Sequence, residues 1–195
     1  MDVLIFSLAF TFFVVANPVG NSPVILALIQ DFDYQKQKKI MFREAVLALL
    51  LALFFQFFGE LFLGLIQVKS YALTYCGGIL LSLVALSMIF PTPPEDVKQM
   101  KREPYFVPIA TPLIAGPGLM TVIMAKSQEM TQWWVITVAI VLAWIPVTLA
   151  LVGSPLMQKV LKRRGMVALE QLMGMILMLI SVEMIVSATM MYLNS

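Results

Sequence analysis

Six long apolar segments dominate the sequence and limit what it can fold into. Each is long enough for a helix to cross a hydrocarbon core of about 30 Å. The segments are roughly residues 3–29, 45–66, 71–90, 105–125, 133–157 and 166–193. Only 12% of the residues are charged, whereas a soluble domain has about 25%. The sequence therefore predicts an all-α integral membrane protein with six transmembrane helices.

The basic residues are distributed unevenly between the connections. Of the 13 Lys and Arg residues, only Lys69 and Lys126 lie outside the connections that follow the first, third and fifth segments. Short loops rich in Lys and Arg face the cytoplasm. Both termini are therefore expected on the non-cytoplasmic side of the membrane.

Two of the apolar segments contain a proline-rich break. Residues 17–23 interrupt the first segment and residues 110–118 interrupt the fourth, each with two prolines five positions apart. Proline removes a backbone donor and clashes with the preceding turn of a helix. Backbone groups freed in this way are tolerated at membrane depth only where protein or a water-filled cavity satisfies them. The breaks therefore predict buried sites.

The polar residues of the breaks suggest how such a site works. Asn17 before Pro18, and Ser22 before Pro23, have the order of an N-cap followed by proline at the first helical position. The resumed half-helices are then expected to offer free backbone N–H groups to a polar or anionic solute. The alternative is a kink that lets helices pack closely around glycine. The candidate substrate-binding residues are Asn17, Pro18, Gly20, Asn21, Ser22, Pro23, Thr111, Pro112, Gly116, Pro117 and Gly118.

The two breaks also indicate an internal duplication. An offset of 94 residues separates Pro18 from Pro112 and Gly59 from Gly153, and Gly174 follows Gly78 by 96. Because each copy would hold three spans, the second copy must be inserted upside down, which gives an inverted 3+3 repeat. We expect the first and fourth helices to be broken at their Pro motifs. The predicted units are residues 1–90, a cytoplasmic linker at 91–104 and residues 105–195.

Few ionisable residues lie within the apolar segments, and such residues are functional candidates because burying a charge is costly. Glu183 and Glu60 are the candidates for a coupling proton. The alternative for each is a hydrogen bond to a neighbouring helix or contact with interfacial water. Glu170 and Glu44 lie at cytoplasmic ends of spans, where anchoring at the interface is the expected role.

Composition also limits the chemistry. The chain has one cysteine, Cys76, and no histidine, so neither a metal site nor a cofactor is expected. It lacks the Gly-rich loop with Lys and Ser or Thr that holds nucleotide phosphates. We therefore do not expect an enzyme.

Several motifs together resemble the MarC family of bacterial inner-membrane proteins, over nearly the whole chain. They are Asn17-Pro18-x-Gly20-x-x-Pro23, Pro112-Leu113-x-Ala115-Gly116-Pro117-Gly118, Gly77-Gly78-Ile79-Leu80-Leu81 and Leu172-Met173-Gly174. The family is similar to the lysine exporter (LysE) superfamily, whose characterised relatives move amino acids or ions outward. The resemblance implies a multi-pass protein of the bacterial inner (plasma) membrane. In place of the basic residue that often precedes the Leu-Met-Gly run in relatives, this chain has Gln171.

Together these features predict a secondary transporter that exports a small polar or anionic solute by alternating access. A channel or passive pore using the same site is one alternative, and a non-transporting membrane scaffold is another. The expected partners are the lipid bilayer and a small molecule or ion, with no nucleic acid. Homodimerisation is left open, because small residues allow helices to pack closely.

Overall fold

The chain folds into helices joined by short connections. The computed structural model describes residues 2–29, 32–65, 67–90, 114–129 and 132–193, and this part of the chain contains no strand. The predicted linker at 91–104 lies outside the described residues. The helices are α1 (Asp2–Ala16), α2 (Ser22–Ile29), α3 (Tyr34–Leu65), α4 (Ser70–Ile89), α5 (Pro117–Glu129) and α6 (Trp133–Leu193).

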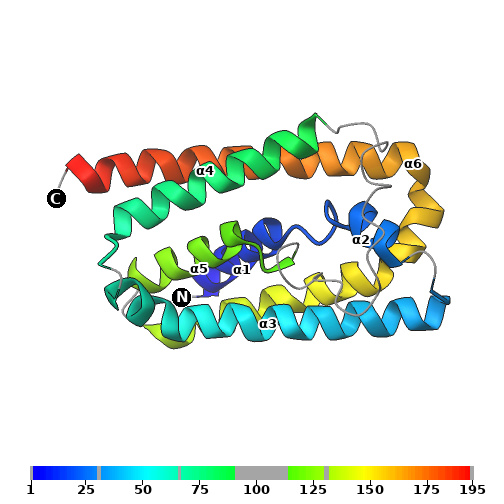
Figure 1. The fold of residues 1–195 in the computed structure, drawn as a ribbon, viewed down its shortest axis with the longest axis horizontal. Helices are drawn as coiled ribbons and strands as arrows, with labels where there is room; N and C mark the ends of the chain where they lie inside the picture. The colour runs from blue at the N-terminus through cyan, green and yellow to red at the C-terminus, as the bar shows by residue number, and fades with distance from the viewer. Residues whose placement is uncertain (1, 30–31, 66, 91–113, 130–131, 194–195) are drawn as a thin grey trace.

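Helix α6 consists of two arms that meet at a sharp bend. Lys162 has φ 52° and ψ −176°, which is not a helical conformation. We call Trp133–Met157 the first arm and Arg164–Leu193 the second arm. Figure 1 shows the chain running along one side of the bundle in the first arm and returning along the opposite side in the second.

Within the described residues, four helical stretches are long and apolar enough to cross a membrane: Tyr34–Gly59, Ser70–Ile89 and the two arms of α6. Two of the six predicted spans are therefore not seen as single helices. The first is divided into α1 and α2 at the predicted break, and only its later part, α5, is described for the fourth. Helix α3 begins at Tyr34, before the apolar segment predicted for the second span, and includes the basic connection.

The helices form two outer layers around a central one. Helix α3 and the first arm lie on one side, α4 and the second arm on the other, and α1, α2 and α5 lie between them (Figure 1). Fully buried side chains such as Phe12, Ile25 and Ile123 come from the central helices. On the outer helices, large apolar side chains such as Leu83 and Leu179 are exposed, as expected of surfaces that face lipid.

Small residues bring α4 and the second arm close together. A Cβ atom added to Gly78 would lie 2.7 Å from Cγ1 of Ile185 and 3.0 Å from the carbonyl oxygen of Ser181. One added to Gly174 would lie 3.1 Å from the carbonyl oxygen of Ala85. The hydroxyl of Ser82 donates to that of Ser181 over 2.9 Å. This seam follows the pattern of membrane helices that pack through small residues and hydroxyl groups.

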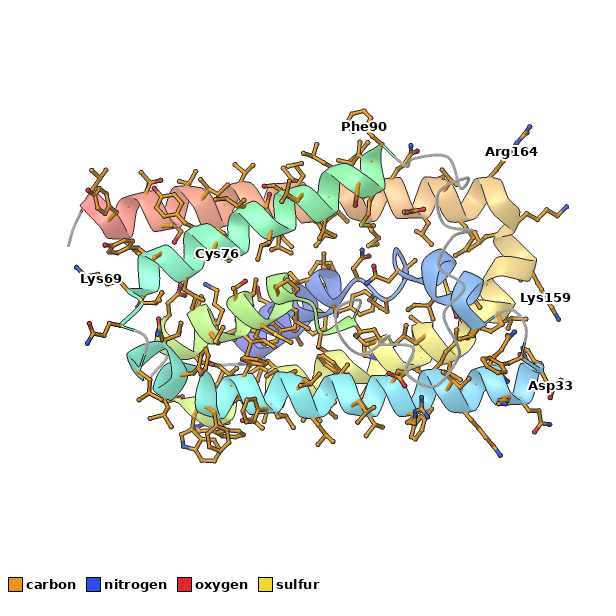
Figure 2. The ribbon with its side chains drawn as sticks, in the orientation of Figure 1. Asp33, Lys69, Cys76, Phe90, Lys159 and Arg164 are labelled. Atoms are coloured by element: carbon orange, nitrogen blue, oxygen red, sulfur yellow. The ribbon has the colours of Figure 1, made fainter. Side chains whose placement is uncertain are left out.

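Basic residues gather at one end of the bundle, where α3 begins with Lys36, Lys38 and Lys39 and where α6 bends at Lys162. Figure 2 shows Asp33, Lys159 and Arg164 at one end and Lys69 near the other. Aromatic rings gather near the Lys69 end, where Tyr71 and Tyr192 lie with their centroids 5.4 Å apart. Aromatic residues of this kind are typical of a membrane–water interface.

Candidate functional site

A pocket of about 260 Å³ lies between the break that follows α1 and the start of α5. Six of the predicted site residues, from both breaks, line it: Asn17, Gly20, Asn21, Gly116, Pro117 and Gly118. Helix α4 contributes Ser87 and Met88, and the second arm contributes Glu170. The structure therefore brings residues of both predicted breaks to one pocket.

Asn17 shapes the first break. Its N–H donates to the carbonyl of Phe13 over 3.1 Å, which completes the last turn of α1. Its φ of 47° then turns the chain out of the helix, a left-handed conformation that Asn tolerates better than most residues. The buried side chain accepts a hydrogen bond from the N–H of Gly20 over 3.1 Å. Asn17 therefore ends one helix and caps the turn that leads to the next.

Ser22 does not act as the predicted N-cap. Helix α2 begins at Ser22 itself, and the Ser22 hydroxyl donates to the carbonyl of Pro18 over 2.6 Å. The residue before the helix is Asn21, whose carbonyl accepts from the N–H of Ile25 over 3.0 Å. An N-cap is the residue whose carbonyl accepts the first bond of the helix, so Asn21 has this position.

Three backbone donors of the first break are bonded within the chain. The N–H of Gly20 bonds to the Asn17 side chain. The N–H of Asn21 bonds to the Asn17 carbonyl over 3.0 Å, and that of Ser22 to the Val19 carbonyl over 3.2 Å. Because the turn satisfies its own donors, the polarity of the break toward the pocket comes from side chains.

The start of α5 differs from the first break in its N-cap and in its backbone donors. Its first residue is Pro117, and the carbonyl of Gly116 accepts from the N–H of Met120 over 3.1 Å, so Gly116 is the N-cap and proline has the first helical position. The next two residues, Gly118 and Leu119, line the pocket. Their N–H groups belong to the first turn, which has no acceptor within the helix. The predicted helix N-terminus at the site is therefore present in the second break.

The remaining predicted residues are not brought to the pocket. Pro18 is buried but does not line it, and Glu183 is exposed on the second arm and does not line it either. The role of Glu183 as a proton carrier stays a prediction. Thr111 and Pro112, and the side chains of Pro23 and Glu60, lie outside the described residues.

Glu170 is the pocket residue that the sequence reasoning placed elsewhere. It was assigned to interfacial anchoring, but its half-buried side chain lines the pocket. It is also the one ionisable residue among those lining it in the described part of the chain. A signal was present in the sequence, because Gly174 follows by four residues and so shares a helix face with Glu170. Gly174 packs against Met88, another pocket residue.

A second hollow, of about 420 Å³, lies on the outer surface of α4. It is larger, but all its lining residues come from that one helix, among them Tyr71, Tyr75 and Cys76. Its wall is almost entirely apolar. A surface of this kind suits contact with lipid tails, so we place the candidate site at the smaller pocket.

The pocket combines polar side chains with the first turn of α5. In the part of the chain that the structure describes, no three Cys, Asp or Glu residues lie close enough to hold a metal ion. The family model for MarC family integral membrane proteins matches residues 3–193. The chain belongs to the MarC family. This MarC protein is an integral membrane protein, in agreement with its four apolar helices.

Curated MarC relatives cover nearly the whole chain. A UPF0056 membrane protein of Chlamydia trachomatis serovar D is 34% identical over 94% of this chain and 92% of its own length. The UPF0056 inner membrane protein YhgN of Escherichia coli K12 is 32% identical over 97% of this chain and 98% of its own length. A relative from Buchnera aphidicola subsp. Baizongia pistaciae is 33% identical over 92% of this chain and 93% of its own length. No solved structure matches the chain significantly.

Proposed function

We propose that this MarC protein is a secondary transporter that exports a small polar solute across the bacterial inner membrane by alternating access. The observation that carries the proposal is the pocket lined by residues of two helix breaks that lie far apart in the sequence. Discontinuous helices that meet inside a bundle are a recurring way to build the substrate site of a transporter.

The pocket narrows the range of solutes. The sequence favoured a polar or anionic solute, on the argument that both breaks offer backbone donors. The N–H groups of Gly20, Asn21 and Ser22 in the first break are occupied within the chain, and the ionisable residue in the pocket wall is an acid. Like charges placed close together repel, so we propose a polar solute without net negative charge.

We further propose that the chain is an inverted 3+3 repeat of six spans. In this arrangement α1 and α2 form the first broken span, and α5 with the segment before it forms the fourth. Glycines at matching positions support it, because Gly78 packs against the second arm and Gly174 packs against α4. The two copies do not match at every position. A Cβ atom at Gly59 would contact Met124, whereas one at the matching Gly153 would meet nothing within 4 Å.

The orientation that we propose puts both termini outside the cytoplasm. Both chain ends lie in the same half of the bundle as the connection between α3 and α4 (Figure 1). The basic residues of the α3 start and of the bend in α6 lie at the opposite end, with Lys159 and Arg164 labelled there in Figure 2. Positive loops are retained in the cytoplasm, so the Lys69 end faces outward.

A thermal-shift screen of the purified protein tests whether the pocket binds a solute. A ligand that binds only the folded state raises the melting temperature by mass action. The screen would compare amino acids, amines, sugars, organic anions and metal ions. We expect a polar compound to stabilise the parent protein, and Gly116→Leu to lose the shift because leucine would fill the pocket.

The matched control is Gly153→Leu, because a side chain at Gly153 enters open space. This variant should keep the full shift. If Gly116→Leu folds and binds the same solute as tightly as the parent, the breaks serve packing and the proposed site is wrong.

A further inference from the structure

We infer that Glu170 binds the positive charge of the transported solute. The inference rests on the proposed function and adds the class of ligand that the pocket accepts. The shared chemistry is a single positive charge, carried by a primary ammonium group of an organic solute or by a monovalent cation. The sequence offered no such role, because it placed Glu170 at the membrane interface.

Glu170 is brought to the pocket by its position in the second arm. It lies six residues after Arg164, where the second arm starts, which corresponds to about 9 Å along the helix. Its side chain is half-buried and lines the pocket together with Asn17, Asn21 and Ser87. A carboxylate at this depth meets the pocket and not only the aqueous end of the bundle.

The Glu170 carboxylate has no bonded partner among the described residues, neither in an ion pair nor in a hydrogen bond. Its neighbour Gln171 does not bond to it, and that amide donates instead to the carbonyl of Ile89 at the end of α4 over 3.2 Å. A carboxylate withdrawn from water without a partner is costly. A cation entering the pocket would provide the missing partner.

The other groups that line the pocket can bind the uncharged part of such a solute. Asn17 accepts one hydrogen bond, from Gly20, at its side-chain oxygen, and an amide oxygen has a second lone pair. The first-turn N–H groups of Gly118 and Leu119 can donate to a hydroxyl or carbonyl group on the same solute. With about 260 Å³, the pocket is far larger than the ~30 Å³ that one water occupies in the liquid. It can therefore hold a small organic ammonium compound as well as an ion.

The test measures melting temperatures of the full-length protein in detergent with four probes. Ethanolammonium chloride and potassium chloride are the cationic probes. Ethylene glycol is the neutral analogue of ethanolamine, and acetate, added as its tetrabutylammonium salt, is the anionic probe. Separate titrations of ethanolammonium and potassium distinguish an organic ammonium site from an ion site. Ionic strength is held constant with a bulky quaternary ammonium salt, so that screening does not differ between probes.

The variants are Glu170→Gln and Glu129→Gln. Glu170→Gln removes the charge but keeps the shape of the side chain. Glu129→Gln is the matched control, because Glu129 is exposed and pairs with Lys126 at the far end of α5. Size-exclusion and far-UV circular dichroism establish that each variant is folded.

We expect at least one cationic probe to stabilise the parent and the Glu129→Gln control, with little effect of ethylene glycol or acetate. In Glu170→Gln the affinity for that cation should fall roughly tenfold or more, as for loss of a charged hydrogen bond. Equal cation binding by Glu170→Gln and the parent would overturn the inference. So would stronger stabilisation by the neutral or anionic probe, or the lack of any shift with both cations.

Flux measurements separate this inference from the proposed function. If the cation binds through Glu170 but does not cross the membrane of proteoliposomes, transport fails and the assignment of Glu170 stands. If an uncharged solute is transported equally by the parent and Glu170→Gln, transport stands and the assignment of Glu170 is wrong.

Discussion

The side-chain amide of Asn17 donates a hydrogen bond to the sulfur of Met88 over 2.9 Å, and this contact joins the helix break to α4. Met88 also packs against Gly174 of the second arm. The break is thereby fixed to both helices of one outer layer. Because Asn17 and Met88 both line the pocket, the contact sets the shape of its wall.

Replacing Asn17 should therefore reduce stability in two separable ways. Asn17→Gly removes both side-chain hydrogen bonds but accepts the left-handed conformation without strain. Asn17→Ala loses the same bonds and adds the cost of that conformation, about 1–2 kcal/mol for a residue with a Cβ atom. We expect the free energy of unfolding to be lower for Asn17→Ala than for Asn17→Gly by roughly this amount.

Denaturant unfolding of the two variants and the parent in detergent measures the difference. Equal stability of the alanine and glycine variants would show that the backbone conformation of residue 17 costs nothing. Both variants should be less stable than the parent, because each loses the cap on Gly20.

Replacing glycine by alanine should have opposite effects on stability at Gly78, in the seam between α4 and the second arm, and at Gly153, on the first arm. In a helix, alanine is favoured over glycine by about 0.5–1 kcal/mol. At Gly153 nothing lies within 4 Å of the added Cβ atom, so Gly153→Ala should stabilise the protein by about this amount. At Gly78 the Cβ atom would lie 3.0 Å from the carbonyl oxygen of Ser181, and overpacking costs about 1–3 kcal/mol.

Gly78→Ala is therefore expected to destabilise the protein overall, and a melting curve of each variant measures the sign of the change. A higher melting temperature for Gly78→Ala than for the parent would mean that the two helices can separate at little cost.

The orientation predicts which engineered cysteines react from outside. Cys76 is exposed, so it is first replaced by serine. In that background, Lys36→Cys at the basic end should resist a membrane-impermeant thiol reagent added to intact cells, whereas Lys69→Cys should react. Labelling of both positions after the cells are opened is the control for accessibility. Reaction at Lys36→Cys but not at Lys69→Cys in intact cells would reverse the proposed orientation.

Much of the fold could be predicted because the membrane leaves few choices for an apolar chain. The lengths of the apolar segments gave the α3, α4 and α6 spans, and the prolines marked the break between α1 and α2. The start of α3 in the basic connection was not predicted, because the residues from Tyr34 onward are polar and yet belong to the helix. Such a helix extends past the membrane core, where hydropathy no longer indicates its boundary.

The candidate site could be predicted only in part. Residue type and spacing identified the break between α1 and α2 and the start of α5, and six of the predicted site residues line the pocket. The hydrogen bonds of Ser22 and Gly20 could not be predicted, since a local turn competes with the ideal cap and only tertiary packing decides between them. Glu170 was misplaced because its distance from the end of the span looked short. How deep the Glu170 side chain lies in the pocket depends on how α4 and the second arm cross, which the sequence does not show.

Solute flux into proteoliposomes is the most direct measurement of whether the protein transports a solute through this pocket. The solute would be the compound that stabilises the parent protein most strongly in the thermal-shift screen. The parent should transport it with saturable kinetics that depend on the proton gradient. Gly153→Leu should transport it equally well, and Gly116→Leu, folded but with leucine in the pocket, should show little flux above empty liposomes. Undiminished flux through Gly116→Leu, or none through the parent, would contradict the account.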